Sequence, residues 1–203
     1  MSGFAASWLA LREPADAAAR SESVVAFAAG HQIRGRLIDL GGGTGANIRY
    51  LASRLPAPQR WTLVDNDPLL LEHAPKGVAT HQADLNAVVE DADLFRGCGL
   101  VTASALLDLV SEHWLAQLVL RCRAVDSAVL FALSYDGRIA CTPAEPEDED
   151  VRALVNAHQR TDKGFGPALG PDAAVRTAAL LSAAGYTVKQ DQSDWNLGPA
   201  STC

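Results

Sequence analysis

A run of glycines after a short apolar segment is the part of the sequence best suited to ligand binding. Residues 36–40 read as a buried strand, and Gly41, Gly43 and Gly45 follow it within the run Gly-Gly-Gly-Thr-Gly. Glycine adopts backbone angles that other residues avoid, and its missing side chain lets a ligand approach the main chain. A helix predicted from Ala46 would point its first amide groups at a ligand above the turn. The segment therefore predicts a site for a nucleotide-type ligand.

Asp39 stands two residues before the first glycine and limits which ligand fits. A carboxylate at the end of a buried strand is costly unless it has a partner. It would repel the pyrophosphate of a dinucleotide and attract the cationic amino-acid end of a ligand. Asp65 follows the next predicted strand, 20 residues after Gly45. A carboxylate there can accept hydrogen bonds from two vicinal ribose hydroxyls, so Asp65 supports an adenosine ligand without selecting which one.

The run Asp-Leu-Gly-Gly-Gly-Thr-Gly that begins at Asp39 resembles the first signature motif of class I S-adenosylmethionine-dependent methyltransferases. The resemblance covers roughly residues 37–133, the cofactor-binding half of such a protein. It implies S-adenosylmethionine as cofactor and S-adenosylhomocysteine as product. Asp39 and the glycines would hold the methionine end, and Asp65 the ribose. Asn47 and Asn66, which stand next to these two motifs, are counted among the cofactor-binding residues.

Four further residues receive cofactor roles from the same resemblance. Asp84 and Leu85, after the third predicted strand, are similar to the adenine motif, with the carboxylate on the exocyclic amine and the leucine on the ring. Ser104, at the end of the fourth strand, stands where the family motif meets the transferable methyl group. Arg20 would close over the cofactor carboxylate. The alternative for Arg20 is a helical ion pair with Asp16, four residues earlier.

Methyl transfer displaces a neutral leaving group from a cationic sulfonium, so an enzyme mainly has to hold acceptor and methyl at near-attack distance. If the acceptor must also lose a proton, His158 and Asp108 are the candidate bases. His158 begins a segment, 158–166, that we expect to be a lid over the acceptor or a plain surface turn. Because Asp108 is not accompanied by clustered acids after the fourth strand, we predict no metal.

Plainer roles stay open for the acidic residues. Asp65 would serve as a helix cap, Asp84 as a turn residue, and Asp39 as a carboxylate satisfied by turn amides, while Asp108 could cap or pair structurally.

Two other functions also stay open. One is a NAD(P)-dependent oxidoreductase that binds its dinucleotide on the same glycine loop. The other is a non-catalytic cofactor-binding protein of the same fold.

The elements that must position these residues alternate between strand and helix. Such alternation predicts an α/β fold with a Rossmann-like, doubly wound, mostly parallel sheet of the seven-stranded type and helices at the N-terminus. The sequence ends at Cys203 without the last strand of such a sheet, so a longer natural chain stays open. Two N-terminal helices divided near Glu13 are expected because Pro14 suits a first turn. The predicted strands are 36–40, 61–64, 78–82, 99–104, 128–134 and 186–190. After the two N-terminal helices, the predicted helices are 46–55, 68–73, 112–124, 151–159 (capped by Asp150) and 171–184.

We expect one methyltransferase domain over residues 1–203, with a helical cap (1–30), a cofactor-binding core (36–135) and a substrate-side segment (136–203). Hydrophobic residues make up 48% of the chain, enough for a full core. The net charge of -7, with 17 scattered basic residues, argues against nucleic-acid binding and favours a small-molecule acceptor.

No apolar run is long enough to span a bilayer, so no membrane association is expected. The four cysteines form no C-x-x-C pair, which indicates a reducing compartment and free thiols. We expect a cytoplasmic monomer or homodimer.

Overall fold

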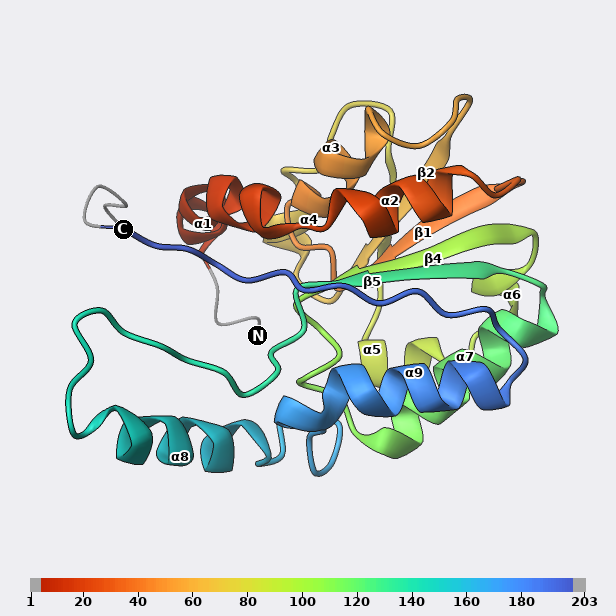
Figure 1. Cartoon of the computed structure of the whole chain (residues 1–203). Coiled ribbons are helices and arrows are strands. Elements are labelled where there is room, and N and C mark those ends of the chain that lie inside the picture. The colour runs from red at the N-terminus through yellow and green to blue at the C-terminus, as the bar shows by residue number, and fades with distance from the viewer. Residues whose placement is uncertain (1–4, 199–203) are drawn as a thin grey trace. The chain divides into compact units, whose positions relative to one another are not determined.

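The computed structural model describes residues 5–198, and Figure 1 shows its helices and strands. These residues form two compact units. The first contains residues 5–104, 121–133 and 189–198, and the second contains residues 105–120 and 134–188. The sheet and the whole glycine loop belong to the first unit.

A five-stranded sheet of order β3-β2-β1-β4-β5 forms the centre of the first unit. All four neighbouring pairs are parallel, as the alternating sequence pattern predicted. The strands are almost free of polar alternation because both faces are covered, so Ile38, Leu40, Leu63, Val64 and Leu100 have no exposed surface. The strands are β1 (Arg36–Leu40), β2 (Arg60–Asp65), β3 (Ala79–Gln82), β4 (Cys98–Ser104) and β5 (Ala128–Ala132).

The strand order reverses between β1 and β4. The chain steps from β1 to β2 to β3 in one direction, then returns to place β4 on the other side of β1. Since crossovers between parallel strands are right-handed, this reversal moves the connecting helices to the opposite face. Ligands of such sheets bind at the carboxyl ends of the strands beside the reversal point. Here those ends are the last residues of β1 and β4, namely Asp39, Leu40 and Ser104.

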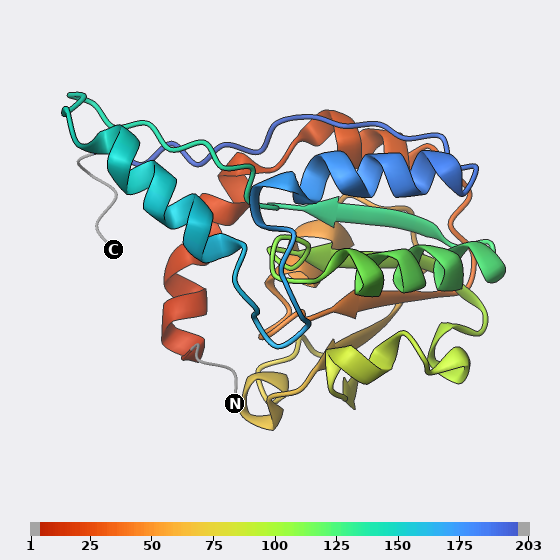
Figure 2. The same ribbon diagram turned by 90° about the horizontal axis from the view of Figure 1, so that it is seen from below.

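Short helices cover the two faces of this sheet. In Figure 1, α2 (Glu22–Ala29) and α3 (Ala46–Ala52) lie on one face, and α5 (Leu85–Val88) and α6 (Ala92–Phe95) on the other. The core on the first face includes Val25, Ile48 and Leu51 from the helices, packed with strand residues such as Leu37 and Leu63. Figure 2 shows the parallel strands from below. The short α4 (Pro68–Leu71) follows β2, where Pro68 occupies the first turn.

The N-terminal helix α1 (Ala6–Ala19) runs unbroken through Pro14. The prediction of two helices divided near Glu13 is therefore wrong. Pro14 cannot donate to the carbonyl of Ala10, but Ala10 is exposed and water can satisfy that oxygen. The helix ends at Arg20 instead, where the backbone becomes extended with φ −68° and ψ 138°. No residue of α1 is buried, so this helix rests on the surface of its unit.

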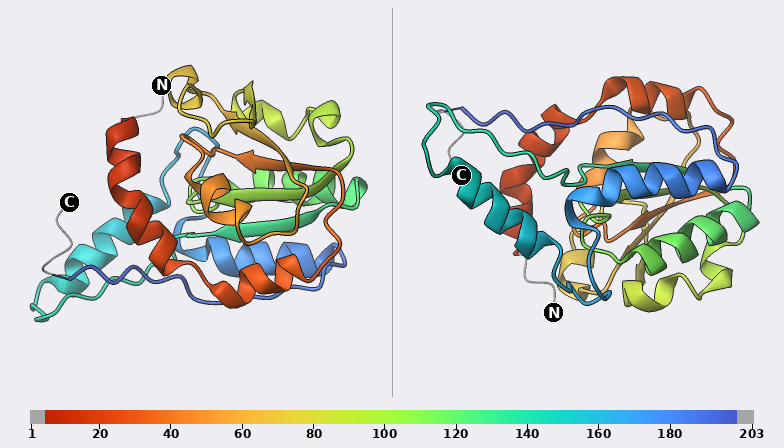
Figure 3. Two further views of the ribbon diagram at one scale, coloured as in Figure 1. Left: turned by 90° about the horizontal axis from the view of Figure 1, so that it is seen from above. Right: turned by 60° about the horizontal axis from the view of Figure 1, so that its bottom comes forward.

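Residues 189–198 run along α2 and α1 without regular secondary structure (Figures 1 and 3). Asp191 accepts hydrogen bonds from Ser21 Oγ (2.7 Å) and Ser23 Oγ (2.8 Å). The guanidinium of Arg12 stands 5.0 Å from the ring centroids of both Trp8 and Trp195. These contacts tie the extended segment to the N-terminal helices.

The second unit contains α8 (Asp148–Gln159), η1 (Gly170–Asp172), α9 (Ala173–Ala183) and the first part of α7 (Glu112–Ala124), which continues into the first unit. The predicted Asp150 cap is wrong, since α8 begins earlier and Asp150 lies in its first turn. The predicted strand at 186–190 is also wrong. Over the described part of the chain that segment pairs with no strand, and a strand exists only through its ladder.

Two further observations concern the whole described chain. Between residues 5 and 198 no helix has both the length and the apolar character needed to cross a membrane. Cys98 and Cys122 are buried and Cys141 is exposed, and all three are free thiols. Cys203 lies outside the described residues.

Candidate functional site

The glycine loop leaves the end of β1 and doubles back over the end of β2. The amides of Gly41 and Gly42 both donate to the carbonyl of Val64, at 2.9 Å and 3.3 Å. Gly41, Gly43 and Gly45 have φ values of 62°, 54° and 81°. Side chains rarely tolerate this left-handed region, which explains why glycine occupies these positions. The turn then feeds directly into α3, as the sequence predicted.

Asp39 is completely buried beneath this turn. Its Oδ1 accepts hydrogen bonds from Asn47 Nδ2 (2.6 Å) and Thr102 Oγ1 (2.7 Å). Its Oδ2 has no hydrogen-bond partner among residues 5–198. A side-chain carbon on Gly42 would lie 2.5 Å from this oxygen, so the turn packs tightly against the carboxylate. Burial raises the pKa of Asp39 to about 6, because the hydrogen bonds from Asn47 and Thr102 and the charge of Arg20 do not compensate for the lost hydration.

Arg20 is buried at the end of α1, with 9% of its surface exposed. Its Nη1 donates to Asn47 Oδ1 and its Nη2 to Ser104 Oγ, both at 2.8 Å. The guanidinium also stands 4.8 Å from the centroid of the Tyr50 ring. Each of these partners is neutral, and no carboxylate of the described chain lies within ion-pair distance. Burial lowers the pKa of Arg20, and the charge of Asp39 opposes that shift.

The alternative ion pair between Asp16 and Arg20 is therefore wrong. Both carboxylate oxygens of Asp16 accept from Arg12, at 3.0 Å each. Arg20 lies past the last helical residue, so its side chain leaves the helix surface and turns toward β4 and α3.

Asp65 faces the glycine loop from the end of β2 and is 7% exposed. Its Oδ2 accepts from the amide of Gly43 (2.8 Å) and its Oδ1 from the amide of Asp67 (3.0 Å). The structure contradicts the alternative that Asp65 caps the following helix, because Asp67 caps α4 through the amide of Leu69. Asn66 next to it is exposed.

Asp84 and Leu85 lie after β3, whose last residue Gln82 is in register with Asp65. Asp84 is exposed and caps α5, accepting from the amide of Asn86 at 2.9 Å. The structural role proposed for Asp84 is thus present, and its second carboxylate oxygen is compatible with a ligand role. The adenine role of Asp84 and Leu85 stays a prediction.

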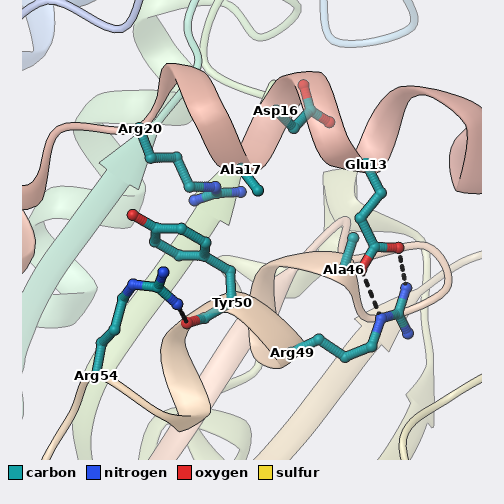
Figure 4. Close-up of a pocket in the computed structure, with 8 residues that line it drawn as sticks. All are labelled: Glu13, Asp16, Ala17, Arg20, Ala46, Arg49, Tyr50 and Arg54. Atoms are coloured by element: carbon teal, nitrogen blue, oxygen red, sulfur yellow. Dashed lines mark hydrogen bonds and ion pairs between the residues drawn. The ribbon is translucent and has the colours of Figure 1, made fainter.

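A cavity of about 240 Å³ opens beside Arg20, between α1 and α3 (Figure 4). Glu13 and Arg49 face each other across it in a two-pronged ion pair of 2.6 and 2.8 Å. Arg20 and Arg54 lie on either side of the Tyr50 ring, with guanidinium-to-centroid distances of 4.8 and 3.9 Å. The ring thereby restricts the movement of Arg20.

The two candidate bases belong to the second unit. His158 is exposed near the end of α8, and its Nε2 lies 3.0 Å from Lys163 Nζ. Asp108 is buried, and its carbonyl accepts from the amide of Gly170 at 2.9 Å. Nothing in these contacts tests a catalytic role, so both assignments stay predictions. No three or more acidic, histidine or cysteine residues between 5 and 198 gather in a metal-binding arrangement, and the expectation of a metal-free protein also stays a prediction.

Sequence reasoning missed Thr102 and Tyr50. Thr102 is a fully buried hydroxyl on β4, in register with Asp39 on β1. A polar residue within the apolar run 99–103, opposite a buried acid on the neighbouring strand, was an available signal. Tyr50 gave no such signal, because its ring is part of the α3 core face and contacts Arg20 only through the tertiary fold.

Comparison with solved structures agrees with this architecture, whereas the sequence itself has no match. No protein-family model and no curated protein matches the sequence. Among solved structures, human N-acetylserotonin methyltransferase in complex with SAM is similar, with 17% identity and a TM-score of 0.51 over 87% of this chain and 46% of that one. An O-methyltransferase family protein from Burkholderia thailandensis gives 18% identity and a TM-score of 0.57 over 90% and 53%. The apo form of the S-adenosylmethionine-dependent methyltransferase SibL gives 21% and 0.50 over 92% and 53%.

The chain has the class I methyltransferase fold. It spans about half the length of these solved structures, at 46–53% of each.

Proposed function

We propose that the protein transfers the methyl group of S-adenosylmethionine to a small-molecule acceptor. The observation that carries this proposal is a pair of buried opposite charges without ionic partners. Asp39 has an oxygen with no hydrogen-bond partner in the described chain, and Arg20 has only neutral partners. Leaving such charges unpaired is costly. One zwitterionic amino-acid group would satisfy both.

The residues present fit the cofactor in its other parts. Asp39 would receive the ammonium of the methionine end, and Arg20 its carboxylate. The carboxylate oxygens of Asp65 each accept one backbone amide, and each keeps a second lone pair for a ribose hydroxyl. Asp84 and Leu85 would hold the adenine, and Ser104 would lie nearest the methyl. When bound, S-adenosylmethionine supplies an activated methyl group, and the chain has to orient it and exclude water.

The similar structures support this reading, since their names describe methyltransferases, one of them in complex with SAM. The dinucleotide alternative has less support, because a pyrophosphate would meet the buried carboxylate of Asp39.

As further parts of the proposal, residues 1–203 form one methyltransferase domain of a cytoplasmic monomer or homodimer. His158 or Asp108 takes a proton from the acceptor if its chemistry requires one.

The first test is calorimetric titration with S-adenosylhomocysteine, with NADH in parallel. We expect micromolar binding of the former only. Asp39→Ala should abolish it, whereas Asp191→Ala, which loses an exposed carboxylate of the same unit, should not. Binding of NADH alone would overturn the proposal.

Turnover is tested separately from binding. Methyl transfer from labelled S-adenosylmethionine to a panel of hydroxyl, thiol and amine acceptors should give labelled product. Tight binding with no transfer to any acceptor, and no slow hydrolysis of cofactor, would favour the non-catalytic cofactor-binding protein.

A further inference from the structure

Asn47 lies between the two charged groups of the site and contacts both. It is 3% exposed, in the first turn of α3. Its Oδ1 accepts from Arg20 Nη1 (2.8 Å), while its Nδ2 donates to Asp39 Oδ1 (2.6 Å) and Thr102 Oγ1 (3.2 Å). One side-chain amide thus connects the cation at the end of α1 to the anion at the end of β1.

The orientation of this amide is fixed by the charges on either side. A flipped amide would direct its N–H groups at the guanidinium and its oxygen at the carboxylate, so both contacts would become repulsive. Aspartate or leucine at this position could make only one of the two contacts or neither. Only an asparagine-sized amide both accepts from Arg20 and donates to Asp39 across this gap.

The neighbouring elements hold the bridge rigidly. Gly45, with φ 81°, is the residue immediately before α3, and two residues later the side chain of Asn47 reaches Asp39 at the end of β1. Thr102 stands opposite Asp39 in the β1–β4 register and donates to the same carboxylate oxygen. Ser104 Oγ accepts a hydrogen bond from the other terminal nitrogen of Arg20. Both bridged groups therefore have a second support that resists rotation.

We propose that Asn47 is a positioning residue that sets the separation of Arg20 and Asp39 to match the carboxylate and ammonium of a single α-amino-acid group. This inference rests on the proposed function, and it replaces the direct cofactor contact predicted for Asn47 with a role through Arg20 and Asp39. Both of its polar atoms are used within the protein. Its effect should therefore be confined to ligands that carry the amino-acid end.

The test compares two ligands in wild type and in Asn47→Leu. S-adenosylhomocysteine carries the amino-acid end, whereas 5′-methylthioadenosine shares the adenosine thioether and lacks that end. Titrations run to millimolar ligand. In the variant we expect S-adenosylhomocysteine to bind about tenfold to a hundredfold more weakly, as befits hydrogen bonds to charged groups. The affinity for 5′-methylthioadenosine should stay within about twofold.

Two controls separate this effect from general damage. Thr62→Val removes another buried hydroxyl from the same sheet and should leave both affinities unchanged. If Asn47→Leu does not fold, as judged by circular dichroism, Asn47→Ser is used, since serine is polar but too short to connect both groups.

Each remaining outcome overturns the inference. Equal weakening of both ligands would show that Asn47 only maintains the loop, and no weakening of either would show that it positions nothing. If wild type binds 5′-methylthioadenosine but not S-adenosylhomocysteine, the amino-acid site is wrong. If wild type binds neither, the proposed function itself fails, and that result is seen before any variant is made.

Discussion

Among single residues, Asp39 has the clearest cost to stability in the candidate site. Its carboxylate is fully buried, and burial raises its pKa to about 6 from an ordinary 3.8. The folded state therefore holds the proton more tightly than the unfolded state does. Stability is greatest when Asp39 is protonated and falls as the pH rises from about 4 to about 6. The full cost at neutral pH is roughly 3 kcal/mol.

Asp39→Asn should remove part of this cost in the ligand-free protein. We expect the free energy of unfolding to rise by about 1 to 2 kcal/mol at pH 7.5. The gain is smaller than the full cost because the amide nitrogen that replaces Oδ2 is also buried without a hydrogen-bond partner. Near pH 4 the variant should gain nothing. Urea unfolding at both pH values measures this difference. A variant that is less stable than wild type at pH 7.5 would contradict the argument.

The single residues that could be predicted were those with a strong local pattern. Asp39 and the three glycines stand in one continuous motif, and the structure places them at one turn. The position of Arg20 was expected near the cofactor, but its partners Asn47 and Ser104 are 27 and 84 residues away in the chain. Asp16, at the right helical spacing, pairs with Arg12 instead. Local spacing could not reveal where α1 ends, and that end determines where Arg20 points.

At the scale of an element, the turn between β1 and α3 depends on the absence of a side chain at Gly42. A side-chain carbon there would lie 2.2 Å from Leu63 Cδ1 and 2.5 Å from Asp39 Oδ2. Leu63 has no exposed surface, so it has little space to move. The added atom must displace the turn or tilt the carboxylate.

We therefore expect Gly42→Ala to lower the free energy of unfolding by about 1 to 3 kcal/mol, as overpacking does. Ligand binding should weaken with it. The matched control is Gly30→Ala at the end of α2, where the nearest atoms would lie 3.5 Å away and the backbone is already helical. That variant should change stability by less than about 1 kcal/mol. Thermal and urea unfolding of both variants provide the comparison, and equal losses would refute the packing argument.

The elements themselves were predictable where periodicity was strong. The parallel order of the strands followed from the alternation of apolar strands with helices. The segment 186–190 has a strand-like composition, yet it gains no ladder, and composition alone cannot supply a partner. Pro14 was expected to divide a helix, but the exposure of Ala10 lets water replace the lost hydrogen bond. Such outcomes depend on solvent and neighbours that the local sequence does not contain.

For the whole molecule, the candidate cofactor site lies within the first unit, which holds Arg20, Asp39, Asp65 and Ser104. Saturating S-adenosylhomocysteine at 100 times its dissociation constant should stabilise the state that binds it by about 2.7 kcal/mol. Hydrogen exchange followed by mass spectrometry should then slow in segments 36–50 and 60–67. The α8 segment of the second unit should change little. Equal slowing in both units would show that they unfold together or that both contact the ligand.

The N-terminal helix also lies beside two tryptophans whose fluorescence can report its position. The chain has four tryptophans, and Arg12 of α1 stands 5.0 Å from the rings of two of them, Trp8 and Trp195. Their exposed fractions of 42% and 40% leave both indoles partly in water. Since indole emission responds to nearby charge and hydration, we expect a shift of α1 against residues 189–198 to change the fluorescence of the protein. Tryptophan fluorescence can therefore follow the position of α1, the helix that ends at Arg20, without an added label.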